Sequence, residues 1–179
     1  MNVGPGRNYL LIISALLLAA DIAATADPSA GRAILQPAQE RKTAPDFVLK
    51  DGSGKTISLR KYRGKVVLVD FWATWCTGCK KEIPWFSEFE KAYHAKGLAV
   101  IGISMDEGGW TAVKPYLAET HIPYPMLLGD NRTAKQYEIE GLPDTFLIDR
   151  KGRVAAAYRQ MLVNKEDVEA NLKAMLSER

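Results

Sequence analysis

The only two cysteines in this chain of 179 residues stand at positions 76 and 79, within the segment VDFWATWCTGCKKEIPWF, residues 69–86. A helix is expected to begin at this pair, so free backbone amides and the helix dipole would stabilise the Cys76 thiolate. Lys80 and Lys81 add positive charge nearby. Cys79 lies one turn further in, where it can displace whatever Cys76 has bonded. The pair therefore predicts an attacking nucleophile and a resolving thiol.

Two structural uses of the same pair are less consistent with the sequence. A zinc site would need two more ligands, and without other cysteines these would be His94, His121 or carboxylates on elements with no sign of convergence. A structural disulfide across two residues closes a very small loop and would constrain the unfolded chain little. Redox chemistry is therefore the leading hypothesis, with the two sulfurs as the whole redox centre and no metal or other cofactor.

The N-terminal residues 1–26 have the layout of a secretory signal peptide. An apolar run occupies residues 9–20, and the small residues of Ala-Thr-Ala at 24–26 would allow cleavage before Asp27. A retained membrane anchor is the alternative, although Asp21 interrupts the run and a span needs roughly 20 residues. Either reading predicts an exported, periplasmic or extracytoplasmic protein. A thiol pair there is oxidised unless something reduces it.

The rest of the chain divides into a predicted linker, residues 27–44, and one predicted domain, residues 45–179. The linker is rich in Pro and Ala with mixed charge and has no sustained apolar period. The whole chain is 47% hydrophobic and 25% charged, which suits a folded domain with a sizeable core. A net charge of +3, scattered along the sequence, gives no reason to expect a nucleic-acid partner.

The domain is predicted to alternate strands and helices. A Gly-rich turn at 51–55 indicates a hairpin at the front, and the β-branched run at 65–72 indicates a strand buried on both faces. The further predicted elements are a helix at 76–94 with Pro84 inside it, strands at 98–105, 124–130, 145–149 and 154–159, helices near 110–117 and 132–140, and a last helix capped by Asn164.

This order implies an α/β domain with a central, mixed sheet and helices on both faces. The strand at 65–72 would deliver Trp75 and Cys76 to its carboxyl end. Ligand and catalytic sites of open α/β sheets lie at that edge.

The segment VDFWATWCTGCKKEIP resembles the active-site segment of the thioredoxin superfamily. The ensemble resembles the exported TlpA, ResA and DsbE branch of thiol-disulfide oxidoreductases, through the front hairpin at 44–65, an inserted αβ segment around 105–128, and GLPDTFLID at 141–149. The resemblance extends over residues 44–177 and implies a thioredoxin-like fold. It also implies an enzyme that exchanges disulfides with protein thiols.

The resemblance carries roles to particular residues. Pro143 would be a cis proline, and the Leu142 backbone before it would hydrogen-bond an extended partner chain without regard to sequence. Trp75 would pack beside the cysteines; a generic core aromatic is the alternative.

Two acids are candidates to take the Cys79 proton, because a desolvated carboxylate with a raised pKa can do so near neutral pH. Asp70 stands where thioredoxin keeps a buried aspartate, and Glu82 where the ResA-like branch keeps a glutamate. Either could act, and Glu82 could instead be an exposed helix residue. Asp144 follows Pro143 where the cytochrome c maturation group often has glutamate, which points to apocytochrome c as a partner.

The leading functional hypothesis is a monomeric reductase of partner disulfides, re-reduced by a membrane electron donor. Gly78 replaces the proline that reducing relatives usually have before the second cysteine, so a disulfide-forming oxidant stays open. A peroxiredoxin-related thiol peroxidase is a further alternative, but its threonine position holds Ala73, and Thr74 is one residue off. The last alternative is a binding domain with an inert disulfide.

Overall fold

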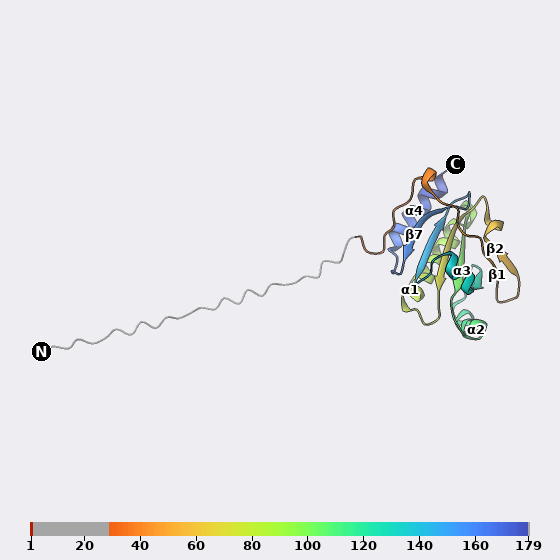
Figure 1. The fold of residues 1–179 in the computed structure, drawn as a ribbon, viewed down its shortest axis with the longest axis horizontal. Coiled ribbons are helices and arrows are strands. Elements are labelled where there is room, and N and C mark those ends of the chain that lie inside the picture. The colour runs from red at the N-terminus through yellow and green to blue at the C-terminus, as the bar shows by residue number, and fades with distance from the viewer. Residues whose placement is uncertain (2–28, 179) are drawn as a thin grey trace.

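The computed structural model describes Met1 and residues 29–178 (Figure 1). The predicted signal peptide or anchor, apart from Met1, lies outside the described residues. Among residues 29–178, no helix is both long enough and apolar enough to cross a membrane.

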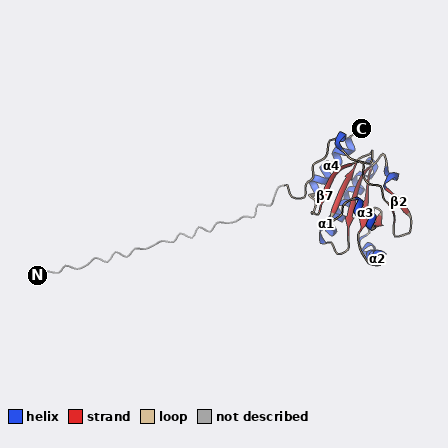
Figure 2. Cartoon of the chain, in the orientation of Figure 1, coloured by secondary structure: helices blue, strands red, loops and turns tan. Residues whose placement is uncertain are grey.

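A five-stranded mixed sheet forms the centre of the domain (Figure 2). Its strands lie in the order β5-β4-β3-β6-β7, in which β3, β4 and β5 run parallel to one another while β6 and β7 pair antiparallel. The predicted mixed sheet is therefore confirmed. The strands are β3 (Val66–Trp72), β4 (Leu98–Ser104), β5 (Met126–Leu128), β6 (Asp144–Ile148) and β7 (Val154–Arg159).

Four α-helices and a separate hairpin complete the domain. The predicted front hairpin is confirmed, and the helix predicted from residue 76 runs without interruption through Pro84. The helices are α1 (Thr77–Tyr93), α2 (Gly109–Thr120), α3 (Asn131–Gln136) and α4 (Lys165–Ser177), the hairpin strands are β1 (Val48–Lys50) and β2 (Thr56–Ser58), and three 3-10 turns cover Ala38–Glu40, Leu59–Tyr62 and His94–Lys96.

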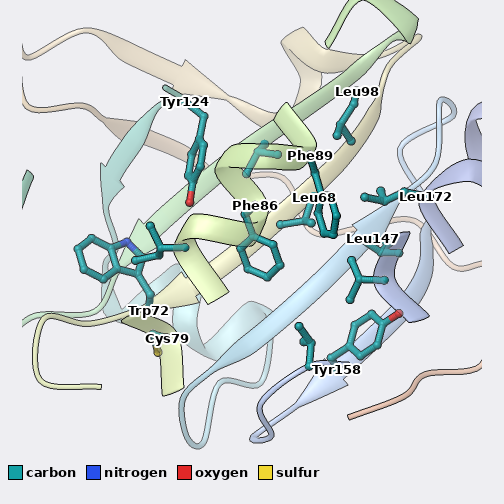
Figure 3. Packing of buried hydrophobic residues seen from close by; sticks show 14 of the residues in the cluster. Leu68, Trp72, Cys79, Phe86, Phe89, Leu98, Tyr124, Leu147, Tyr158 and Leu172 are labelled. Atoms are coloured by element: carbon teal, nitrogen blue, oxygen red, sulfur yellow. The ribbon is translucent and has the colours of Figure 1, made fainter. Parts of the chain in front are cut away.

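The sheet separates two hydrophobic clusters. On one face, α1 and α4 pack on the strands, and Phe86, Phe89 and Leu172 lie in this cluster with Leu68 and Leu147 of the sheet (Figure 3). Burying each such side chain contributes about 1.5–3 kcal/mol. The opposite face packs against the β1–β2 hairpin and the end of α3, with the residues Phe47, Phe71, Tyr137 and Phe146 in contact.

Residues 31–44, here called the N-terminal strap, lie along the outer edge of the domain beside β7 and α4 (Figure 1). The Gln36 amide donates to the carbonyl of Ala155 over 2.8 Å, and the Val154 amide donates to the carbonyl of Lys42 over 2.8 Å. Composition predicted a linker here. These hydrogen bonds are made by backbone groups, so the side-chain pattern of the strap did not predict them.

The sheet register determines where the redox segment meets the rest of the chain. β3 ends at Trp72, four residues before Cys76, and its antiparallel partner β6 begins at Asp144. Phe71 pairs with Asp144 in this register. The residues after β3 and the residues before β6 therefore emerge at the same edge of the sheet, which brings Pro143 to the cysteines.

Candidate active site

Cys76 and Cys79 form a disulfide at the start of α1. Cys76 is the N-cap of the helix, and its Sγ accepts a hydrogen bond from the Cys79 amide over 3.1 Å. Cys76 is 6% exposed, whereas Cys79 is fully buried at 0%. Cys76 is therefore the more accessible of the two sulfurs, which is the arrangement expected of a nucleophile followed by a resolving thiol.

The peptide bond between Leu142 and Pro143 is cis, which confirms the expectation from the resemblance. A side-chain carbon added at Gly78 would lie 3.4 Å from Cδ of Pro143. The proline ring thus contacts the backbone between the two cysteines. Leu142 is partly exposed beside it, with its backbone at the rim of the redox site.

Trp75 is 68% exposed, so the alternative of a core aromatic is wrong for this residue. Its side chain lines a surface pocket together with Met105, Gly108 and Ala112, which come from the segment after β4 and from α2. Thr74, Asp106 and Glu107 line the same pocket, so the surface beside Trp75 is partly apolar and partly polar.

Glu82 lies one turn after Cys79 and is fully buried, so the alternative of an exposed helix residue is wrong. Its Oε1 accepts a hydrogen bond from the Val163 amide over 2.7 Å. Its Oε2 has no hydrogen-bond partner within the described part of the chain. Burial raises the pKa of Glu82 to about 7, and the Val163 hydrogen bond opposes that rise.

Asp70 is also fully buried, in the middle of β3. Neither of its carboxyl oxygens has a hydrogen-bond partner among the described residues. Burial, and after it the charge of Glu82, raise the pKa of Asp70 well above its ordinary value. Both carboxyl groups are therefore shifted toward the protonated form, and its pKa of about 7 leaves Glu82 poised between its two forms at neutral pH.

Sequence reasoning missed a buried carboxylate that fixes the segment before Cys76. Asp106 accepts hydrogen bonds from the Thr74 amide at 3.0 Å, from the Thr74 hydroxyl at 2.5 Å and from the Ser104 hydroxyl at 2.8 Å. A signal was available: Asp106 follows the carboxyl end of β4, the parallel neighbour of β3. Polar side chains at that edge of adjacent parallel strands meet.

Asp144 is buried and paired within the protein. Its Oδ1 accepts from the Gln160 amide over 2.5 Å, and its Oδ2 lies 3.0 Å from Nε of Arg159. The pKa of Asp144 is raised, chiefly by burial. Its carboxylate is thus directed into the β6–β7 edge rather than toward a bound partner.

Residues 41–157 match the model of the AhpC/TSA family. The chain belongs to this family. It is 36% identical over 133 residues to the thiol-disulfide oxidoreductase ResA of Bacillus thuringiensis subsp. konkukian, covering 74% of this chain and 76% of the relative. It is 33% identical over 134 residues to the ResA of Geobacillus kaustophilus, with the same coverage.

Solved structures of related proteins agree with this family assignment. A structure from Chlorobium tepidum assigned as the thiol:disulfide interchange protein DsbE has 30% sequence identity and a TM-score of 0.71, covering 76% of this chain and 97% of that one. The fold is therefore thioredoxin-like, and the protein is a thiol-disulfide oxidoreductase of the ResA and DsbE type with Cys76 and Cys79 as its redox pair.

Proposed function

We propose that the protein is an exported reductase that opens disulfides in partner proteins. The observation that carries the proposal is that Cys76 and Cys79 differ in their access to solvent and in their neighbours. Cys76 reaches the surface and its sulfur faces a helix amide, whereas Cys79 is buried one turn before a carboxylate with a pKa of about 7. This arrangement suits attack by one sulfur and deprotonation of the other.

The chemistry uses two electrons from the reduced pair. The Cys76 thiolate attacks one sulfur of the partner disulfide, that bond breaks, and the partner's other sulfur leaves as a thiolate. Cys79 then loses its proton and attacks Sγ of Cys76. The mixed disulfide breaks, the Cys76–Cys79 bond forms, and the partner departs fully reduced.

Glu82 is the residue we propose as acceptor of the Cys79 proton. A base works best when its pKa is close to the working pH, and Glu82 meets this condition. Burial and the charge of Glu82 both raise the pKa of Asp70, so this carboxyl group favours its protonated form. We assign Asp70 the role of a buried neighbour of Glu82 rather than that of the proton acceptor.

The partner chain would bind as an extended segment against the Leu142 backbone, next to the exposed Trp75 ring. We extend the proposal to apocytochrome c as one partner, because of the acid at position 144. Asp144 would act on partner choice through the Pro143 loop, since its carboxylate is occupied by Arg159 and the Gln160 amide.

The remaining parts of the proposal concern the source of electrons and the location of the protein in the cell. A reductase outside the cytosol needs electrons from a membrane carrier, and residues 1–26 would export the domain or tether it. Cell fractionation tests the second point: a mature chain beginning at Asp27 in the extracytoplasmic fraction indicates cleavage, and full-length protein in the membrane indicates an anchor.

The test of the reductase is the midpoint potential of residues 27–179 in glutathione buffers, with free thiols counted by alkylation. A value near or below roughly −270 mV supports the proposal, and one near roughly −120 mV means that the protein forms disulfides instead. Peroxide consumption would favour the thiol peroxidase. The Thr74 hydroxyl argues against it, because Asp106 binds that hydroxyl.

A further inference from the structure

The hydrogen bond to Glu82 comes from a loop outside α1. Val163 belongs to residues 160–163, the loop that joins β7 to α4. Met161 and Leu162 in this loop are 39% and 42% exposed, whereas Val163 is buried. The Val163 side chain anchors one point of this loop in the hydrophobic cluster, and the position of its amide also depends on what holds the end of the loop next to α4.

Gly31 of the N-terminal strap holds the end next to α4. Its carbonyl accepts a hydrogen bond from the Asn164 amide over 2.7 Å. Gly31 has a φ of 75°, and a side-chain carbon there would lie 2.5 Å from the Leu162 carbonyl oxygen and 2.6 Å from the Asn164 nitrogen. Only glycine permits this approach of the two backbones.

Two further bonds fasten the same part of the strap to α4. The Ala33 amide donates to Oδ2 of Asp167 over 3.1 Å, and the Ala33 carbonyl accepts from Nδ2 of Asn171 over 3.1 Å. Asn164, the N-cap of α4, accepts from the Asp167 amide over 2.9 Å. The strap, the helix cap and the loop are therefore one hydrogen-bonded unit that ends on the Glu82 carboxylate.

We propose that Gly31 and Ala33 of the strap are positioning residues of the redox site, which hold the 160–163 loop so that the Val163 amide stays bound to Glu82 during disulfide exchange. The inference rests on the proposed function, in which Glu82 takes the Cys79 proton. It adds that the N-terminal strap influences the pKa of Glu82, and so how readily Glu82 accepts that proton.

The direction of the effect follows from the chemistry of the bond. An amide donor stabilises the carboxylate form, so loss of the Val163 bond raises the pKa of Glu82. The ionisable group that interacts with Glu82 is Asp70, from β3, which belongs neither to the strap nor to the loop. Loosening the strap should therefore change Glu82 through the Val163 bond alone.

The resolution step isolates this effect. Reduced full-length protein is mixed with 5,5′-dithiobis(2-nitrobenzoate), which joins one nitrothiobenzoate to Cys76 and releases the other. Cys79 then displaces the bound group and closes the disulfide. The rate of the second release is measured against pH in wild type, Gly31→Ala and Gly54→Ala. Gly54 is the matched control, because its φ is 88° and nothing lies within 4 Å of an added carbon.

The rate of the second release rises with pH around a midpoint. We expect this midpoint to be higher by about half a pH unit to one unit in Gly31→Ala, and to be unchanged in Gly54→Ala. Faster hydrogen exchange of the Val163 amide should accompany the shift. In a Glu82→Gln background, Gly31→Ala should cause no further change. An unmoved midpoint in Gly31→Ala, with the Val163 amide exchanging faster, would overturn the inference.

The proposed function is judged separately by Glu82→Gln alone. If that variant keeps the wild-type pH dependence, Glu82 is not the acceptor, and the inference falls with that assignment. If it loses the dependence while Gly31→Ala does not shift it, only the role of the strap is wrong. Should Gly31→Ala fail to fold, Asn171→Ala removes the bond to the Ala33 carbonyl and must produce the same midpoint shift.

Discussion

The backbone amide of Cys79 donates a hydrogen bond to Sγ of Cys76 over 3.1 Å. This bond would stabilise negative charge on Cys76, the nucleophile of the proposed mechanism. The same helical turn buries Cys79 completely and leaves Cys76 6% exposed. Access and charge therefore both favour Cys76 for the first step of the proposed mechanism.

The first prediction concerns the two cysteines separately. Cys76→Ser should lose insulin reduction completely, because the proposed nucleophile is gone. Cys79→Ala should keep the first step and accumulate mixed disulfides, which appear as a mass increase that dithiothreitol removes. If Cys76→Ser retains activity or Cys79→Ala traps nothing, the roles are assigned wrongly.

The second prediction concerns the rate of resolution. Glu82→Gln should slow the second release of nitrothiobenzoate by on the order of a hundredfold, the lower end of what a general base contributes. Wild type should speed up as pH rises through about 7, where Glu82 loses its proton, and the variant should lack this rise. Glu119→Gln, an exposed acid on α2, should behave as wild type. An equal slowing in Glu119→Gln would mean that the effect is not specific to the site.

Much of this site could be predicted because its signals are local in the sequence. The spacing of the cysteines and the apolar strand before them were enough to place the pair at the start of a helix at a sheet edge. The burial of Glu82 also had a signal, since it stands three residues after Cys79 and four before Phe86, on one helical face.

The parts that were missed depend on contacts between distant segments. The Val163 amide lies 81 residues from Glu82 in the sequence, and a backbone donor carries no residue-type signal. The strap was predicted as a linker for the same reason, because its bonds to β7 use main-chain groups. Trp75 shows the opposite difficulty: its residue type suits a core, but its side chain is 68% exposed at the rim of the redox site.

The third prediction is a pH dependence of stability. The pKa of Glu82 is about 7 in the folded protein against 4.5 for a free glutamate, so between these values the folded state holds more protons than the unfolded state. The contribution of Glu82 to stability must therefore fall as pH rises from 4.5 through 7, by about 3 kcal/mol in total.

Urea unfolding of the oxidised protein measures this effect. Glu82→Gln has no proton to lose, so its stability relative to wild type should improve by about 3 kcal/mol between pH 4 and pH 8. Glu119→Gln supplies the comparison for an exposed acid. Parallel stability curves for wild type and Glu82→Gln would show that Glu82 titrates normally.

The fourth prediction concerns the carboxylate that sequence reasoning missed. Asp106→Ala leaves the Thr74 amide and hydroxyl without their acceptor, which should cost about 2 kcal/mol of stability and loosen the segment before Cys76. The first release of nitrothiobenzoate should slow, because Cys76 is no longer held at the helix start. Asp106→Asn keeps one acceptor oxygen and should recover most of both losses.

Glu107→Ala is the matched control, since Glu107 is the exposed neighbour of the buried Asp106. The second release should be unaffected in Asp106→Ala, because the Asp106 carboxylate accepts from Thr74 and Ser104, and no hydrogen bond among the described residues joins it to Glu82. This separation distinguishes a positioning role from general destabilisation, which would slow both phases together. Equal slowing of the two phases would therefore assign Asp106 to the stability of the fold and not to the attack by Cys76.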